Sequence, residues 1–253
     1  MNTAHNITTA CWGEVKQHSE YHWAILPWGA TEPHNGHLPY CTDMLASTAI
    51  ACDLVEKLEQ DGIYARVLPG VPFGSQNPGQ TDLPFCLHTR QETQAAILRD
   101  IIRSLRHQGI GRMLIINGHG GNSFKGMIRD FMAEFPDFLI LESEWFTVLP
   151  RKDYFEADVD DHAGEQETSV MMHYYPELVK MAYAGEGKAR PFAIEGLRNK
   201  VAWHPRNWSR ITDDTGIGDP SRASAAKGRA YAEEVVRRYA ALLKDITLRG
   251  DLY

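Results

Sequence analysis

The sequence lacks the features that mark several classes of protein. Its four cysteines show no CxxC spacing, so we expect free thiols rather than a zinc knuckle or a disulfide framework. No apolar run approaches the roughly 20 residues of a membrane span, and the N-terminal residues show neither the basic nor the apolar segment of a secretory signal. The formal net charge of −7 argues against a nucleic-acid-binding surface, which needs a basic stripe. These absences predict a cytoplasmic protein without a nucleic-acid or membrane partner.

The composition is that of an ordinary globular protein, with 253 residues of which 43% are hydrophobic and 23% are charged. This length is ample for a substantial core. We find no internal repeat, no low-complexity tract and no convincing linker. The sequence therefore predicts a single domain over residues 1–253.

Short apolar runs alternate with segments of helical periodicity through the first 150 residues. Strands are expected at about 22–27, 64–68, 112–116 and 138–141, and helices at 43–60, 89–107 and from after 122 to about 135. This alternation predicts right-handed βαβ units and a largely parallel sheet. A last helix is expected at about 221–245, after a loop-rich segment at 177–219. Ligands of such sheets gather beyond the carboxyl ends of the strands.

The segment after the first expected strand, WGATEPHNGHLPYCTD at 28–43, contains four side chains that could bind a metal or carry a proton: Glu32, His34, His37 and Asp43. Glu32 and His34 are two residues apart, so in an extended backbone they leave on the same side. Thr42 is typical of a helix N-cap, and Asp43 would open the helix that follows. Oxygen and imidazole ligands mixed in this way suit zinc, manganese or iron. The alternative is a polar turn with an ordinary N-cap.

Two further motifs carry groups with similar chemistry. NGHGGN at 117–122 places His119 between glycines just past a strand, and the amides of Gly120 and Gly121, expected at a helix start, would face an anionic oxygen. HAGEQETS at 162–169 contributes His162 and Glu167. With Glu32, His34 and Asp43, this inventory supports two divalent ions that share a carboxylate, for which Asp43 is the candidate. His162 would move a proton during attack by an activated water.

Other polar and aromatic residues receive structural interpretations. A loop rich in glycine and proline at 69–84 is long enough to be functional. Glu165 is expected to be a solvated carboxylate, Asp160 and Asp161 loop charges, and Trp203 and Trp208 core or interface residues. Five other histidines are expected to be hydrogen-bonded structural groups: His37, His88, His107, His173 and His204. Of these, His37 could also donate a hydrogen bond to a metal ligand.

A competing interpretation concerns residues 117–123. Gly118 and Gly120 between a strand and a helix resemble part of a dinucleotide fingerprint, which would indicate a nucleotide-binding oxidoreductase. The third glycine position is Ser123, and this alternative leaves Glu32, His34 and Asp43 without a role. A serine hydrolase is disfavoured because no GxSxG motif occurs.

Taken together, the motifs resemble those of the creatininase (creatinine amidohydrolase) family. The resemblance covers about residues 20–240 and is carried by GATEPHNGHLPYCTD at 29–43, NGHGGN at 117–122, HAGEQETS at 162–169 and GIGDPSRASAAKG at 216–228. It implies a three-layer α/β/α domain with a mostly parallel central sheet, two divalent ions, and hydrolysis of a C–N bond in a small amide. It also implies homo-oligomers, often hexamers.

Carried over by position, the resemblance implies that Glu32, His34, Asp43 and His119 are metal ligands and that His162 lies beside the substrate. Three positions depart from the family pattern. Creatininases have a glutamate ligand where this chain has Gly121, and we assign the vacancy to Glu167. Their aromatic substrate contact is Gly120 here, and the loop around Ser75 differs on the substrate side.

These departures put creatinine itself in doubt as the substrate. NGHGGN is also the form seen in formylaminopyrimidine deformylases and mycofactocin precursor peptidases. The resemblance therefore predicts a metal-dependent amidohydrolase that acts on a small cyclic amide or formamide. Its cofactor would be two divalent ions, zinc or manganese, with iron as a further option. His162 and Glu167 are the expected catalytic residues, and Ser75, Gly120, Gly121 and His162 the expected substrate-binding residues. A metal-binding relative without catalytic activity is the remaining alternative.

Overall fold

A parallel four-stranded sheet forms the centre of the computed structural model, which describes residues 5–250 and 252–253. The strands are β1 (Trp23–Trp28), β2 (Ala65–Val67), β3 (Arg112–Asn117) and β4 (Leu139–Glu144), in the spatial order β2-β1-β3-β4. All three pairings are parallel. The expected parallel sheet is confirmed, and each strand lies within a residue or three of its predicted bounds.

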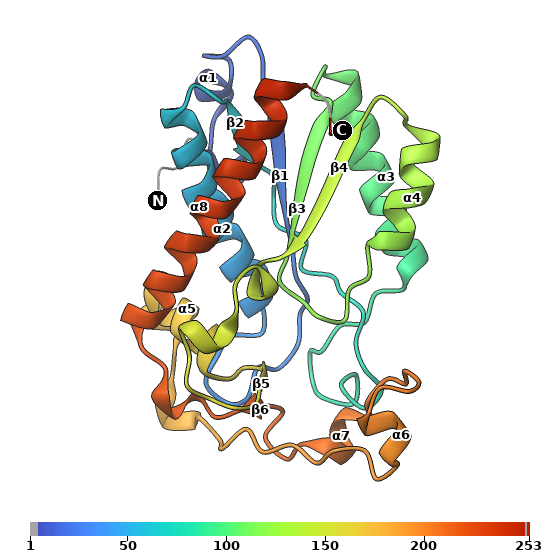
Figure 1. Ribbon diagram of the computed structural model, residues 1–253, viewed down its shortest axis with the longest axis vertical. Helices are drawn as coiled ribbons and strands as arrows, with labels where there is room; N and C mark the ends of the chain where they lie inside the picture. Colours follow the sequence, from blue (N-terminus) through green and yellow to red (C-terminus); the bar gives the residue numbers. More distant parts are fainter. Residues whose placement is uncertain (1–4, 251) are drawn as a thin grey trace.

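Two helical layers cover the two faces of this sheet (Figure 1). Helices α2 (Thr42–Gln60) and α8 (Ala225–Arg249) pack on one face, and α3 (Gln91–His107) and α4 (Lys125–Glu134) pack on the other. Helix α5 (Glu165–Tyr174) packs against α8 and α2 beyond the carboxyl ends of the strands (Figure 1). Because successive side chains of a strand alternate between faces, Trp23 and Ile25 enter the core beneath α2 and α8. Leu26 and Trp28 enter the core beneath α3 and α4. The expected three-layer α/β/α arrangement is confirmed.

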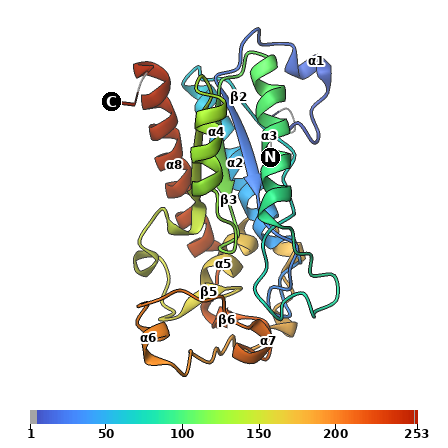
Figure 2. The same cartoon turned by 90° about the vertical axis from the view of Figure 1, so that its right-hand side faces the viewer.

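The carboxyl ends of β1 and β3 point toward a region built from irregular segments (Figures 1 and 2). This region contains β5 (Asp160–His162) and β6 (Ile217–Gly218), which pair antiparallel, and the short helices α6 (Glu195–Arg198) and α7 (Trp208–Ile211). Another short helix, α1 (Trp12–Val15), lies near the opposite end of the sheet. Single 3-10 turns occur at Trp145–Thr147, Arg151–Asp153, Pro176–Leu178, Met181–Tyr183 and Pro220–Arg222. Residues that are far apart in the sequence therefore lie close together beyond the carboxyl edge of the sheet.

Several helix starts differ from the prediction. Helix α2 begins at Thr42, with Cys41 at the cap position, and the Thr42 hydroxyl donates to the Pro39 carbonyl rather than capping the helix. The last helix begins at Ala225, because residues 220–222 form a separate 3-10 turn and the hydroxyl of Ser224 caps α8. Local sequence signals rarely specify such boundaries, since caps compete over a few residues.

Two other expectations concern thiols and membranes. The four cysteines are free thiols, as predicted. Among the described residues, no helix has the length and apolar character needed to cross a membrane.

Candidate functional site

Six polar side chains from three separate segments meet beyond the carboxyl edge of the sheet. The segment after β1 supplies Glu32 and His34, the first turn of α2 supplies Asp43, and the turn after β3 supplies His119. His162 ends β5, and Glu167 lies in the first turn of α5. The structure thus brings together all six residues that the sequence suggested as metal ligands or proton carriers.

Two glycines allow this convergence. A Cβ atom at Gly29 would lie 2.4 Å from the Met44 amide nitrogen, and one at Gly118 would lie 2.4 Å from the Asp43 carbonyl oxygen. Both distances are shorter than any ordinary contact. The segments that follow β1 and β3 can therefore approach the start of α2 this closely only because these two positions are glycine. Gly118 therefore serves the packing of β3 against α2, which places Asp43 between the two strand ends.

Short distances connect the six side chains into overlapping groups. The Nδ1 atom of His119 lies 2.9 Å from Glu32 Oε1 and 3.3 Å from Asp43 Oδ2. The Nε2 atom of His34 lies 2.7 Å from Asp43 Oδ1. Three groups have ligand atoms within 4.8 Å of one another: Glu32, Asp43 and His119; His34, Asp43 and Glu167; and Glu32, His34 and His162. Asp43 contributes to the first two groups with different oxygens.

The ring orientation of each histidine is set by a backbone carbonyl. His34 Nδ1 lies 3.0 Å from the Glu32 carbonyl, His119 Nε2 lies 2.8 Å from the Ser75 carbonyl, and His162 Nε2 lies 2.9 Å from the Pro33 carbonyl. A carbonyl only accepts hydrogen bonds, so these ring nitrogens carry the hydrogen. The opposite nitrogen of each ring faces the carboxylates, which is the arrangement of metal-binding histidines.

Among the described residues, two carboxylate oxygens at the centre, Glu32 Oε1 and Asp43 Oδ2, face only ring nitrogens and have no hydrogen-bond donor while His119 Nδ1 is unprotonated. Both residues are about 1% exposed. A buried anionic oxygen without a donor is costly unless a cation neutralises it. Orphaned oxygens facing ring nitrogens form a donor set that fits divalent zinc or manganese.

Without metal, protons supply the positive charge in this cluster. Burial opposes the charged form of His34, but the attraction of Asp43 raises the pKa of His34 to about 10. Burial likewise opposes the charge of His119, but Glu32 and Asp43 raise its pKa well above the usual range. Burial raises the pKa of Glu167 to about 8. The pocket thus retains protons at groups that must lose them to bind a metal.

The pKa of His162 is shifted in the opposite direction from those of His34 and His119. Burial, reinforced by the nearby His34, lowers the pKa of His162. Its ring lies 4.3 Å from the His34 ring and 5.2 Å from the Trp208 ring, which it meets edge-on. Its neutral imidazole therefore occupies an enclosed place at the border of the cluster.

The residues expected on the substrate side differ in their placement. Ser75 contributes its carbonyl to His119, while its hydroxyl accepts from Gln94 and contacts the Thr89 carbonyl. Gly120 and Gly121 lie in a turn, and α4 begins only at Lys125, so the prediction that their amides open a helix was wrong.

The two glycines also face different surroundings. A Cβ at Gly121 would lie 2.2 Å from the Ser75 carbonyl oxygen, whereas one at Gly120 would meet open space. Position 121 therefore has no room for the family's glutamate without displacement of its neighbours, while position 120 is exposed and open.

Several structural interpretations also need correction. Glu165 is fully buried, where it accepts hydrogen bonds from the backbone amides of residues 156 and 157 and pairs with Lys227 at 2.5 Å. The side chain of Asp160 is 3% exposed and accepts a hydrogen bond from the Gln166 amide at the start of α5. Trp203 is 85% exposed and so is not a core residue, whereas Trp208 is buried as expected.

Sequence reasoning missed Gln80, a loop residue that is 1% exposed and whose amide donates to Glu32 Oε2. Its only sequence signal is its place in the long irregular loop.

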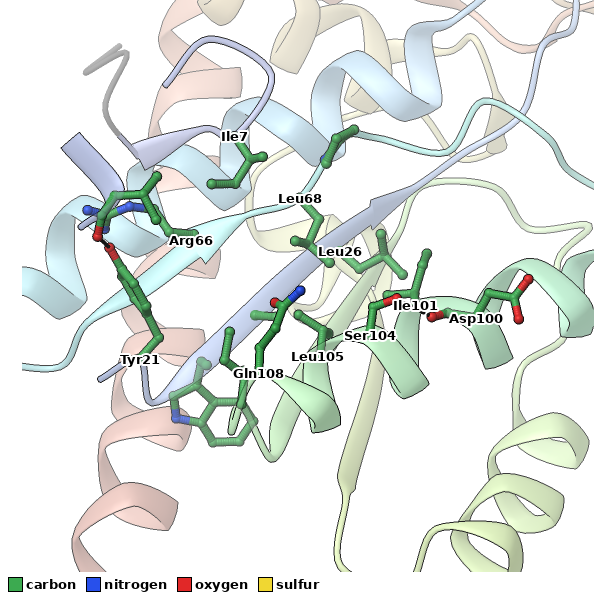
Figure 3. A pocket seen from close by; sticks show the side chains of 15 residues that line it. Ile7, Tyr21, Leu26, Arg66, Leu68, Asp100, Ile101, Ser104, Leu105 and Gln108 are labelled. Carbon is green, nitrogen blue, oxygen red and sulfur yellow. Dashed lines mark hydrogen bonds between the residues drawn. The ribbon is translucent and has the colours of Figure 1, made fainter. Parts of the chain in front are cut away.

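A separate hollow of about 530 Å³ lies between the sheet and α3 (Figure 3). Leu26, Leu68, Leu105 and other apolar side chains line it, with Tyr21 and Arg66 along one side. None of the six clustered side chains contributes to its lining. We therefore place the candidate chemistry at the carboxyl edge and not in this apolar hollow.

The fold and the cluster define a three-layer α/β protein whose histidines and carboxylates gather at the carboxyl edge of a parallel sheet. The creatininase family, described as creatinine amidohydrolase, matches residues 8–243. The chain belongs to this family, as the sequence resemblance implied.

Individual relatives agree with this assignment. The chain is 30% identical over 246 residues to a creatinine amidohydrolase of Pseudomonas putida, with 89% of this chain and 85% of the relative covered. It is 29% identical over 223 residues to a mycofactocin precursor peptide peptidase of Mycobacterium ulcerans, covering 84% and 80% of the two chains. A crystal structure of a putative creatinine amidohydrolase from Bacteroides fragilis superposes with a TM-score of 0.95 at 53% identity, over the whole of both chains.

Proposed function

We propose that this chain is a metal-dependent amidohydrolase that cleaves the C–N bond of a small cyclic amide or formamide. The observation that carries the proposal is the pair of buried orphan oxygens, Glu32 Oε1 and Asp43 Oδ2, surrounded by ring nitrogens whose opposite atoms are held by backbone carbonyls. Two solved creatininases that share this fold at 23% identity are described as a Zn–Zn form and a manganese form. We assign two divalent ions, zinc or manganese, to the cluster of this chain.

The geometry suggests a role for each ligand. Glu32, Asp43 and His119 would hold one ion, and His34, Asp43 and Glu167 would hold the other, with Asp43 shared. When bound, such ions polarise a carbonyl group and make a water molecule more acidic. Glu167 takes the place of the glutamate that the family has at position 121.

His162 is proposed to transfer the proton. Its Nε2–H is held by the Pro33 carbonyl, so its Nδ1 atom is free to accept a proton within the cluster, 3.7 Å from Glu32 Oε1. Its lowered pKa keeps the ring neutral and hence able to act as a base. The Trp208 ring packs edge-on against the imidazole, which is 7% exposed. Glu167, with a raised pKa in the metal-free protein, is the second candidate for a catalytic proton step.

The substrate side is proposed to include Ser75, Gly120 and Gly121. Open space at Gly120, where creatininases carry an aromatic contact, supports a substrate other than creatinine. The relatives act on chemically different C–N bonds, according to their names: one is a peptidase and another a creatinine amidohydrolase. A small amide or formamide fits the enclosed cluster, in which five of the six side chains are at most 7% exposed.

A substrate panel tests the proposal. Protein stripped of metal and reconstituted with zinc, manganese or iron is incubated with creatinine, formamides and short peptides, and release of the amine is measured. We expect hydrolysis of a cyclic amide or formamide that depends on added metal. Hydrolysis of peptides alone would reassign the substrate class. Two bound ions without turnover of any amide would support the non-catalytic alternative, and stoichiometric binding of NAD would revive the oxidoreductase interpretation.

A further inference from the structure

Gln80 is a fully enclosed polar residue in a loop that otherwise consists largely of turn-forming residues. Its side chain is 1% exposed. The side-chain Oε1 accepts a hydrogen bond from the Asn77 amide at 2.7 Å, and Nε2 donates to Glu32 Oε2. Because the backbone amide of Asn77 can only donate, the orientation of the Gln80 carboxamide is determined, and its NH₂ group must face Glu32.

This contact gives the two oxygens of Glu32 different surroundings. Oε2 is occupied by the Gln80 donor, whereas Oε1 has no hydrogen-bond partner and faces the Nδ1 atoms of His119 and His162 at 2.9 Å and 3.7 Å. An amide NH₂ group cannot coordinate a cation, and it occupies a lone pair of Oε2, so Oε1 is the oxygen left without a partner. Glu32 is left with a single oxygen directed into the cluster.

The loop that carries Gln80 is itself firmly held. The Trp208 amide donates to the Pro78 carbonyl at 2.7 Å, and the Leu83 amide donates to the Gln80 carbonyl at 3.0 Å. Gly79 has a φ of +84°, and a Cβ there would lie 2.8 Å from Ser209 Oγ. Only glycine tolerates both the backbone conformation and the close approach of α7. The position of the carboxamide is therefore imposed by the fold on both sides of the loop.

We propose that Gln80 is a positioning residue that restrains Glu32 to single-oxygen coordination and thereby raises the affinity of the site formed by Glu32, Asp43 and His119. This inference rests on the proposed two-ion function. Residues that hydrogen-bond to metal ligands typically contribute 10- to 100-fold to metal affinity. Among the described residues, the Gln80 side chain forms no hydrogen bond with His34, Asp43 or Glu167, so we expect its contribution to be confined to one of the two ions.

The test is a zinc titration of metal-free full-length protein in competition with a chromophoric chelator, which gives a dissociation constant for each of the two ions. Gln80→Met keeps nearly the same volume and removes the donor, so we expect one dissociation constant to rise about 10- to 100-fold while the other stays unchanged. Gln76→Met is the matched control, because Gln76 lies in the same loop and its amide donates to the Leu87 carbonyl. The control is expected to bind both ions as the unaltered protein does.

If Gln80 had a merely structural role, its substitution would lower the affinity for both ions together or leave both affinities unchanged. Either result overturns the proposal. Should Gln80→Met not fold, Gln80→Leu also removes the donor, and the same selective loss of affinity for one ion is expected. If the unaltered protein binds no divalent ion, the proposed function fails together with the inference. If it binds two and the variants match it, only the role of Gln80 is lost.

Discussion

The substitution Asp43→Asn is the most direct test of the proposed two-ion centre. Asp43 directs Oδ1 to His34 at 2.7 Å and Oδ2 to His119 at 3.3 Å, so each oxygen belongs to a different ligand group. Asparagine has the same shape but carries no charge and has only one oxygen. We therefore expect the substitution to weaken the binding of both ions, whereas Glu167→Gln weakens the binding of only the ion that Glu167 is proposed to hold.

The size of the effect follows from linkage between binding and folding. An ion at 1,000 times its dissociation constant stabilises the folded protein by about 4.1 kcal/mol. Loss of a direct ligand should exceed the roughly 100-fold effect of residues that only support ligands. At the same ion concentration, a site weakened by about 100-fold retains only about 1.4 kcal/mol. Two weakened sites thus lose about 5 kcal/mol, which lowers the Tm by roughly 10–20 °C for a chain of this length.

The assay is thermal unfolding of Asp43→Asn and unaltered protein, each with and without zinc, together with elemental analysis of metal content. Asp53→Asn is the matched control, since Asp53 lies on the same helix but accepts its hydrogen bond from Tyr174. The control should retain the full stabilisation by zinc. Two ions bound to Asp43→Asn with unchanged affinity would falsify the shared-ligand assignment.

Three further outcomes are expected. His162→Ala should leave both ions bound while turnover falls by roughly 10²- to 10⁴-fold; in steady-state kinetics, an undiminished rate removes His162 from the mechanism. Gly121→Glu should lower metal affinity instead of adding a ligand, because its Cβ would lie 2.4 Å from His119 Nε2, and metal titration decides between the two results. For metal-free protein, the raised pKa of His34 contributes stability that is complete below about pH 6.5 and is lost as the pH rises through about 10. His34 alone contributes a loss of up to about 1.4 kcal/mol per pH unit between pH 7 and 9, and His119 and Glu167, whose pKa values are also raised, add to it. In denaturant unfolding, a stability that increases over this range contradicts the electrostatic account of the cluster.

Much of the architecture could be predicted because it depends on local patterns. The apolar runs at β1 and β3 and the helical periodicity between them are short-range features, and they led to the parallel sheet that the structure shows. Glu32, His34 and Asp43 lie within twelve residues, so their association was visible in the chain. His119 could be joined to them because both segments follow parallel strands, whose carboxyl ends share one edge of a sheet.

Boundaries and burial were predicted less well. Gly120 and Gly121 were expected to open a helix that in fact begins at Lys125. Glu165 was expected in solvent, yet Lys227 and two backbone amides hold it in the interior. Such partners lie far away in sequence or compete over a few residues, so no local pattern reveals them.

The sequence by itself determined the order of the elements and the chemical character of the candidate ligands, because periodicity and residue type are properties of the chain. Only the tertiary structure decided which oxygen of Asp43 faces which histidine, which ring nitrogens are held by carbonyls, and that Gln80 lies against Glu32. The physical reason is that hydrogen bonding and desolvation depend on distances of a few tenths of an ångström. Those distances are set by the packing of loops against helices that are far apart in the chain.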